Sequence, residues 1–215
     1  MPKLILVRHL QSQWNLENRF TGWVDVPLSR VGLRETKKVA QQLKGKKIDV
    51  IYTSPLIRNK MTVLKILENL DKKKYPLFIH LKGRMKEWGH FHKINKNYWP
   101  VYVSESLNER YYGQLQGLNK AQMMKKYGQE KVQLWRRSFT VRPPGGESLK
   151  DTYQRVIPFY RQYIEKDLKK GKNVLVVASH NSLRALVKYL EKVPDEAIPQ
   201  LEIPYAGMRK YDFPI

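Results

Sequence analysis

Three short apolar runs constrain the fold of this 215-residue chain more than any other feature. They are Leu4–Val7, Ile48–Tyr52 and Val174–Ala178, and β-branched side chains are common in all three. Apolar runs of this length, without alternating polar residues, are typical of strands that are buried on both faces of a parallel sheet. A chain that contains such strands must also supply helices to cover both faces.

Segments with helical periodicity lie between these runs. An apolar stripe over 29–43 follows Ser29, and another over 181–190 follows Asn181, so each of these residues is a candidate N-cap. A third amphipathic segment spans 148–168, where Pro158 predicts a kink. Strands that alternate with helices predict an α/β fold, a three-layer sandwich in which helices flank a mostly parallel central sheet.

The whole chain, residues 1–215, is predicted to form a single domain. Its length is typical of one domain, and it contains neither an internal repeat nor a low-complexity linker. The stretch from about 70 to 106 is less regular than the rest and includes the lysine run 72–74. We therefore expect an irregular insertion or flap at about 70–106.

The charge and the composition limit the classes of partner. Lys and Arg number 41 against 19 Asp and Glu, a net charge of +22, which brings nucleic acid, anionic membranes and phosphorylated metabolites into consideration. The absence of cysteine excludes disulfides and thiolate catalysis. No apolar run approaches the roughly 20 residues of a membrane helix or forms a signal-peptide core. A cytoplasmic protein without membrane association is expected.

Polar and basic residues follow all three predicted strands. Arg8 and His9 come after the first, Arg58 lies beyond the second, and His180 follows the third. Ligands of open α/β sheets bind at the carboxyl ends of the strands, so these side chains are expected to meet. A neutral imidazole between guanidinium groups suits phosphoryl transfer, because the imidazole attacks phosphorus while arginines neutralise the oxygens.

The remaining motifs predict no further chemistry. His80, His90 and His92 lack the spacing and the partners of a zinc site, and Gly145–Gly146 lacks the Lys-Ser or Lys-Thr ending of a phosphate loop. No helix-turn-helix, zinc-finger or RNA-recognition pattern is present. We expect no metal and no nucleic-acid partner, and we interpret the lysine runs as solvated faces.

Several longer blocks resemble a known family. They are Arg8-His9 with Ser12, Trp14 and Asn15; Asn18 to Trp23 with Asp25, Leu28 and Ser29; Tyr52 to Ser54 with Leu56 and Arg58; Leu107 to Gly113; Leu118 to Lys120; Trp135 to Ser138; Glu147 to Leu149; and Asn181 to Leu186. In this order they resemble the cofactor-dependent phosphoglycerate mutases of the histidine phosphatase superfamily. The resemblance covers nearly the whole chain.

The resemblance implies an isomerase that interconverts 3-phosphoglycerate and 2-phosphoglycerate in glycolysis and gluconeogenesis. It implies 2,3-bisphosphoglycerate as phosphoryl donor, no metal, small phosphorylated three-carbon acids as partners, and it allows a homo-oligomer. His9 would carry the phosphoryl group beside Arg8, Arg58 and His180, and Glu109 would exchange the hydroxyl proton with a pKa raised by burial. The implied substrate-binding residues are Asn15, Thr21, Gly22, Arg110, Tyr111, Tyr112, Lys120, Arg136, Arg137 and Asn181.

The chain departs from the family pattern in three places. Leu10 stands where the family has a glycine. Where the family reads Ala-His-Gly-Asn, this chain has Ala178-Ser179-His180-Asn181. In an alignment without a gap, Ser179 occupies the position of the family's histidine. In an alignment with a one-residue deletion, His180 occupies that position and the glycine is missing. We favour His180, because a second imidazole is needed beside the phosphoryl group. The segment 203–211 resembles the final strand of the family only loosely, which predicts poorer exclusion of water.

Two alternative functions remain open at this point. A phosphatase of the same superfamily would share His9 and the arginines but release phosphate to water. A catalytically impaired homologue would instead use the basic surface to bind a polyanion, a reading motivated by Leu10, the shifted His180 and the net charge of +22.

Overall fold

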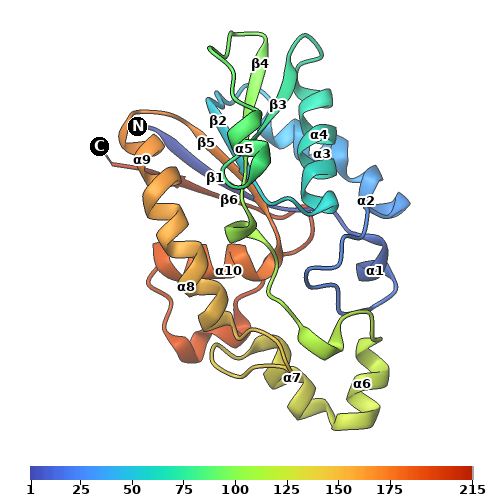
Figure 1. Cartoon of the computed structure of the whole chain (residues 1–215). Coiled ribbons are helices and arrows are strands. Elements are labelled where there is room, and N and C mark those ends of the chain that lie inside the picture. Colours follow the sequence, from blue (N-terminus) through green and yellow to red (C-terminus); the bar gives the residue numbers. More distant parts are fainter. Residues whose placement is uncertain (215) are drawn as a thin grey trace.

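A six-stranded sheet forms the centre of the computed structural model, which describes residues 1–214 (Figure 1). The strand order is β3-β4-β2-β5-β1-β6, and only the β6–β1 pair is antiparallel. The strands are β1 (Lys3–Arg8), β2 (Val50–Thr53), β3 (Tyr75–His80), β4 (Tyr98–Val103), β5 (Val174–Ala178) and β6 (Met208–Asp212). The predicted mostly parallel α/β sheet is confirmed.

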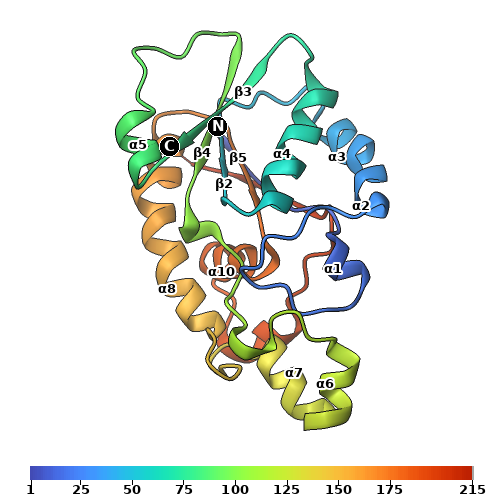
Figure 2. The ribbon, with the colours of Figure 1, turned by 45° about the vertical axis from the view of Figure 1, so that its right-hand side comes forward.

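Helices cover both faces of this sheet, as the views in Figures 1 and 2 show. The α-helices are α1 (Gln13–Leu16), α2 (Arg30–Arg34), α3 (Thr36–Leu43), α4 (Ile57–Leu70), α5 (Arg84–Trp88), α6 (Lys120–Tyr127), α7 (Gln129–Arg137), α8 (Leu149–Phe159), α9 (Glu165–Lys169) and α10 (His180–Leu190). Short 3-10 helices are η1 (Glu105–Leu107), η2 (Gly113–Leu115) and η4 (Asp195–Gln200), and η3 (Tyr160–Ile164) is a π-helical turn. Within residues 1–214, no helix is long and apolar enough to span a membrane.

Alternate residues of β1 belong to the two halves of the core. Leu4 and Leu6 pack with side chains of α8 and α10 on one face, while Ile5 and Val7 pack with side chains of α3 and α4 on the other. Leu4–Val7 and β5 are therefore apolar at every position, which is why these two runs were recognisable in the sequence. The predicted runs match β1, β2 and β5 closely, although the middle strand begins two residues late, at Val50.

The two predicted N-caps have different outcomes. The Ser29 side chain accepts the Gly32 N–H at 2.9 Å and begins α2 as expected, but the predicted helix is divided at Glu35 into α2 and α3. The prediction for Asn181 is wrong. α10 begins at His180 with Ser179 as its N-cap, two residues before the predicted cap, and the Asn181 amide is directed at Glu109 instead of at its own helix.

The segment 148–168 is helical but not uniform. Ser148 begins α8 in a capping box with Asp151, and the π-helical turn η3 follows Pro158 before α9 continues the path. Proline lacks an N–H and clashes with the preceding turn, so a change in the hydrogen-bond pattern beside it is expected. The irregularity predicted at Pro158 is thus a widened turn that begins at Tyr160.

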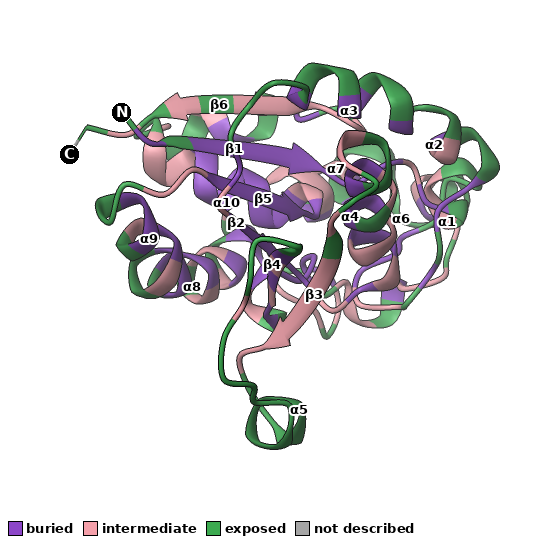
Figure 3. Cartoon of the chain, turned by 90° about the horizontal axis from the view of Figure 1, so that it is seen from above, coloured by how far each residue is buried: buried purple, intermediate pink, exposed green. Residues whose placement is uncertain are grey.

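The stretch 70–106 is more regular than the sequence predicted. It contains β3 and β4, which pair in parallel from Tyr75↔Tyr98 to His80↔Val103. Pro76 and Pro100 lie inside these strands, and proline normally argues against a strand away from a sheet edge. Between the two strands, every residue of 82–97 except Ile94 is exposed, and α5 projects from the body in Figure 3.

β6 brings the two ends of the described chain together. It pairs with β1 from Lys3↔Asp212 to Val7↔Met208, and the Phe213 N–H donates to the Pro2 carbonyl at 2.9 Å. The segment that leads into β6 consequently runs beside the carboxyl end of β1. At the same edge of the sheet, α6 and α7 pack over a separate apolar cluster that includes Phe20 and Trp135.

Candidate active site

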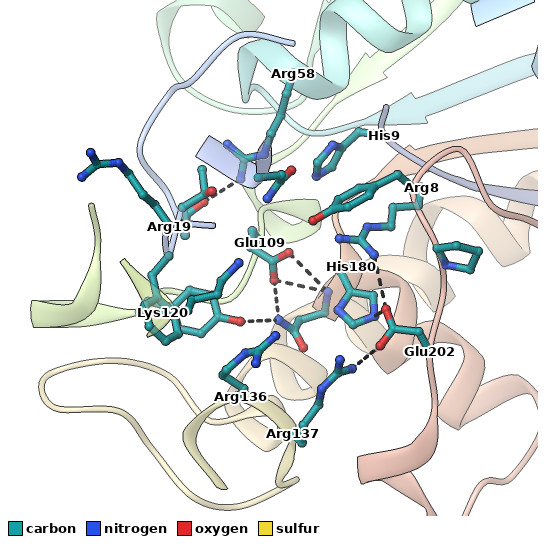
Figure 4. A pocket seen from close by; sticks show the side chains of 18 residues that line it. Arg8, His9, Arg19, Arg58, Glu109, Lys120, Arg136, Arg137, His180 and Glu202 are labelled. Atoms are coloured by element: carbon teal, nitrogen blue, oxygen red, sulfur yellow. Dashed lines mark hydrogen bonds and ion pairs between the residues drawn. The ribbon is translucent and has the colours of Figure 1, made fainter. Parts of the chain in front are cut away.

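A cavity of about 360 Å³ lies at the carboxyl ends of β1, β2 and β5 (Figure 4). Its lining comprises Arg8, His9, Asn15, Arg19, Phe20, Thr21, Gly22, Arg58, Glu109, Tyr112, Lys120, Arg136, Arg137, His180, Asn181, Glu202, Pro204 and Tyr205. Every residue predicted for the site lines this cavity except Arg110 and Tyr111. The strand ends do bring together side chains that are far apart in the sequence.

The His9 ring is held in one tautomer. Its Nδ1 lies 2.6 Å from the Leu10 carbonyl, which can only accept a hydrogen bond, so Nδ1 carries the proton and Nε2 keeps a lone pair. The residue is 3% exposed. Burial, followed by the charges of Arg58 and Arg8, holds the pKa of His9 well below its usual value. A neutral imidazole with a free Nε2 suits a nucleophile.

Leu10 points away from the cavity. Its side chain is fully buried in the apolar cluster that contains Ile5 and Val63, and its N–H donates to Thr62 Oγ1 at 3.2 Å. The leucine that replaces the family's glycine therefore leaves the space beside His9 unobstructed. It adds apolar contacts to the core between the sheet and α4.

Arg58 holds the loop that forms one wall of the cavity. It is 1% exposed and donates to the carbonyls of Gly22 at 2.6 Å and Val24 at 2.9 Å. Gly22 has φ +55, and a side chain there would collide with Gln116, so only glycine fits this turn. Burial lowers the pKa of Arg58 to about 10, and the group remains a cation at neutral pH.

Arg8 connects the nucleophile strand to the segment before β6. Its Nη1 donates to the Ile203 carbonyl at 2.5 Å, and its guanidinium carbon lies 3.8 Å from the centre of the Tyr205 ring. Its buried Nε has no hydrogen-bond partner among residues 1–214. That N–H is positioned to serve a ligand.

The structure distinguishes Ser179 from His180. Ser179 is fully buried, accepts the Asn59 amide at 3.1 Å and does not line the cavity. His180, the first residue of α10, does line it, with Nε2 3.1 Å from Glu202 Oε1. Burial lowers the pKa of His180 to about 4, although Glu202 acts in the opposite direction. The catalytic role of His180 stays a prediction.

Glu109 is anchored through one carboxylate oxygen. Oε1 accepts the Arg110 N–H and the Asn181 side-chain amide, each at 2.7 Å, and the Asn181 backbone N–H at 3.2 Å. The expected raised pKa is wrong. Burial does raise it, but His180, these N–H donors and Arg58 outweigh burial and hold the pKa of Glu109 below its usual value. Glu109 is thus ionised and able to accept a proton.

Arg110 and Tyr111, both predicted to bind substrate, lie outside the cavity lining. Arg110 is fully buried and donates to the Arg136 carbonyl at 2.9 Å and to the Tyr112 hydroxyl at 3.2 Å. Tyr111 is 40% exposed, and its N–H donates to Glu147. The two residues flank the site without lining it, because Arg110 is engaged with Arg136 and Tyr112 and the Tyr111 side chain is exposed.

Arg184 was part of a recognised block but received no role from the sequence. This fully buried guanidinium donates to Asn181 Oδ1 at 2.9 Å, to the Arg137 carbonyl at 2.9 Å and to the Ile198 carbonyl at 2.6 Å. Together with Arg110 it binds the last carbonyls of α7, where a cation is favourable. These contacts fix the point from which the side chains of Arg136 and Arg137 enter the cavity.

The cavity carries an excess of positive charge. Six cationic side chains but only two carboxylates line it. Burial, then the neighbouring Arg136 and Arg8, lower the pKa of Lys120 to about 8. In the described range 1–214, Thr21 Oγ1 and His180 Nε2 are also buried without a hydrogen-bond partner, and no group of three or more His, Asp or Glu side chains is arranged to hold a metal ion. The donors suit an anion with several oxygen atoms.

The sequence did not predict five lining residues. They are Arg19, Phe20, Glu202, Pro204 and Tyr205. Arg19 and Phe20 belong to a recognised block, and that signal could have placed them here. Glu202 and Tyr205 gave no such signal, because their place at the cavity depends on the antiparallel pairing of β6 with β1.

Comparisons with known proteins agree with this geometry. The model of the histidine phosphatase superfamily (branch 1) matches residues 4–97 and 91–214. The 2,3-bisphosphoglycerate-dependent phosphoglycerate mutase of Methanococcus vannielii is 48% identical over 95% of this chain and 87% of its own length. The enzyme of the same name from Chlamydia pneumoniae is 45% identical over 95% of this chain and 90% of its own.

Solved structures show the same fold. A mycobacterial glucosyl-3-phosphoglycerate phosphatase, in complex with VO3, superimposes with a TM-score of 0.75 at 25% identity, covering 98% of this chain and 92% of that one. The chain belongs to the histidine phosphatase superfamily, and within it to the cofactor-dependent phosphoglycerate mutases.

Proposed function

We propose that this protein is a phosphoglycerate mutase that interconverts 3-phosphoglycerate and 2-phosphoglycerate through a phosphohistidine on His9. One observation carries the proposal. A neutral imidazole with its proton fixed on Nδ1 and an ionised carboxylate, Glu109, line the same cationic cavity. Nucleophile, proton acceptor and anion-binding groups are the parts that phosphoryl transfer between hydroxyl groups requires.

His9 acts as the nucleophile. Its Nε2 forms a bond to phosphorus while the bond from phosphorus to the substrate oxygen breaks, and the reverse step returns the phosphoryl group to a hydroxyl. Arg8 offers its free Nε–H to a phosphoryl oxygen. Both Nη atoms of Arg58 are engaged with carbonyls, so Arg58 contributes its charge and the shape of the wall.

Glu109 moves the hydroxyl proton. Oε1 is committed to N–H donors, whereas Oε2 has only a long 3.4 Å contact to the Asn181 N–H, so Oε2 is the oxygen that exchanges the proton. A phosphate dianion beside Arg58 offsets the charge of this cation, which lowers the Glu109 pKa. The carboxyl therefore becomes a better proton acceptor once an anionic substrate binds.

The donor set fits 2,3-bisphosphoglycerate, which supplies the phosphoryl group that charges His9. Arg8, Thr21 and His180 each have a buried polar atom without a hydrogen-bond partner, and Lys120, Arg136 and Arg137 provide further cations. These groups would bind the phosphates and the carboxylate of the ligand. The Asn15 side chain accepts from Ser12 Oγ at 2.8 Å through Oδ1, so its NH2 group is the part that would donate to the ligand.

The decisive experiment follows both products. Purified protein is incubated with 2-phosphoglycerate and a trace of 2,3-bisphosphoglycerate, while 3-phosphoglycerate and free phosphate are quantified separately. The proposal predicts 3-phosphoglycerate as the main product and a phosphohistidine that disappears in His9→Ala. Free phosphate alone would assign the protein to the phosphatases of the superfamily, and the absence of both products would exclude either enzyme.

A further inference from the structure

Two carboxylates line the cavity, and they are held in different ways. Glu109 is 7% exposed and is fixed by N–H groups of the backbone and of Asn181. Glu202 lies on the irregular segment between η4 and β6, and its side chain is 46% exposed. Its polar neighbours are all side chains that carry or can carry positive charge: Arg8, Arg137 and His180. Figure 4 shows Glu202 lying between these three groups.

Glu202 makes its main contact with Arg137. Oε2 accepts from Arg137 Nη1 in a short ion pair, whereas Oε1 accepts a long 3.5 Å hydrogen bond from Arg8 Nη1 and lies 3.1 Å from His180 Nε2. Burial raises the pKa of Glu202, but His180 and Arg137 lower it further, so the carboxylate is ionised at neutral pH. The Glu202 carboxylate is thus an anion of the protein itself that pairs with Arg137, a cation of the cavity.

The Glu202–Arg137 pair is exchangeable. The Arg137 side chain is 30% exposed, compared with 9% for Arg8, so water reaches the ion pair that a ligand would have to replace. An ion pair in contact with solvent contributes little net free energy. A ligand anion that accepts from Arg137 in the same way can therefore displace Glu202.

We propose that Glu202 is a specificity-determining residue, a built-in counter-anion that competes with the second anionic group of the ligand for Arg137. The inference rests on the proposed function, in which Arg137 contacts that second group. A ligand with a single anionic group occupies the space beside His9 and Arg8 and leaves the Glu202–Arg137 pair in place. A ligand with two anionic groups must break the pair, so Glu202 weakens the binding of such ligands selectively.

Calorimetric titration of the dephosphorylated protein tests this inference without catalysis. The ligands are 3-phosphoglycerate, which has a phosphate and a carboxylate, and inorganic phosphate, which has one anionic group. Glu202→Gln is expected to bind 3-phosphoglycerate about fivefold more tightly than the unaltered protein, and inorganic phosphate within about twofold. Glu196→Gln, an equal charge change at an exposed residue of η4, is the matched control and is expected to alter neither affinity.

A double-mutant cycle assigns the effect to Arg137. If Glu202 acts by competition, Glu202→Gln has no effect on 3-phosphoglycerate binding when Arg137 is already replaced by Gln. Equal tightening for both ligands would overturn the inference in favour of a general field effect, and weaker binding in Glu202→Gln would show that the carboxylate supports the site. If the unaltered protein bound neither ligand, the proposed function itself would fail.

Discussion

Asn181 donates twice to Glu109 Oε1, through its backbone N–H at 3.2 Å and through its side-chain amide at 2.7 Å. The amide is oriented by Arg184, which donates to Asn181 Oδ1 at 2.9 Å and leaves Nδ2 facing the carboxylate. The first turn of α10 therefore sets both the position and the protonation of the proposed proton acceptor.

Replacing Asn181 by Ala removes only the side-chain donor. Because a hydrogen bond to the ionised form lowers a pKa, its loss raises the pKa of Glu109. The acid limb of the pH profile of kcat/KM should move to higher pH, since Glu109 must be ionised to accept a proton. Asn69→Ala, on the exposed side of α4, is the control. An unchanged acid limb would contradict the proposed role of Glu109.

Acid should destabilise the protein through its buried histidines. The pKa of His180 is lowered from 6.5 to about 4 in the folded protein, so the unfolded chain binds more protons between these two values. The contribution of the neutral His180 ring to the free energy of unfolding is therefore complete above about pH 6.5, and it is lost as the pH falls toward 4. His9, Glu109 and Glu202 act in the same direction.

Urea unfolding at several pH values measures this dependence. The free energy of unfolding should fall between pH 7 and pH 4.5, and His180→Asn should make the fall shallower by up to about 1.4 kcal/mol per pH unit. His90→Asn, in the exposed segment before β4, should leave the slope unchanged. Identical slopes for both variants would mean that His180 is solvated in the folded protein.

Leu10 should matter for stability more than for catalysis. Its fully buried side chain fills the core beside α4, so Leu10→Ala is expected to cost about 2–5 kcal/mol of unfolding free energy. Leu16→Ala, at a position that is 49% exposed, should cost less than about 0.5 kcal/mol. A faster enzyme without loss of stability in Leu10→Ala would show that the leucine obstructs the site.

Arg184 should act as a positioning residue for the two sides of the cavity that it connects. Lys in its place keeps the charge but cannot reach Asn181, the Arg137 carbonyl and the Ile198 carbonyl together. We expect kcat/KM to fall about 10- to 100-fold, with the acid limb displaced as in Asn181→Ala. Arg161→Lys, on the surface next to Tyr189, is the control. A fall in kcat/KM without a displaced acid limb would limit Arg184 to a structural role.

The inner sheet and the nucleophile were predictable because their signals are local. Leu4–Val7, Val50–Tyr52 and Val174–Ala178 are apolar at consecutive positions, and the two residues after the first run, Arg8 and His9, line the cavity. His9 and Arg58 followed from the rule that ligands bind at carboxyl ends of strands. The resemblance to a family then added Glu109, which composition and spacing alone could not have identified.

The missed features depend on contacts between distant segments. The low pKa of Glu109 arises from donors on α10, and Glu202 reaches the cavity only because β6 returns beside β1. β3 and β4 were missed because each contains a proline, and Pro76 lies on the edge strand, where the absence of an N–H is tolerated. None of these facts has a signature within one stretch of sequence.

The meeting of the two chain ends has a practical consequence. Phe213 donates to Pro2, and Lys3 pairs with Asp212 at 2.5 Å, so a short flexible linker would join the ends without disturbing the sheet. New ends placed within 82–97, where nearly every residue is exposed, would interrupt no strand. A circularly permuted chain with ends near Gly89 is therefore expected to fold with the same strand order. In it, the nucleophile and the segment that carries Glu202 would be close neighbours along one continuous stretch of polypeptide.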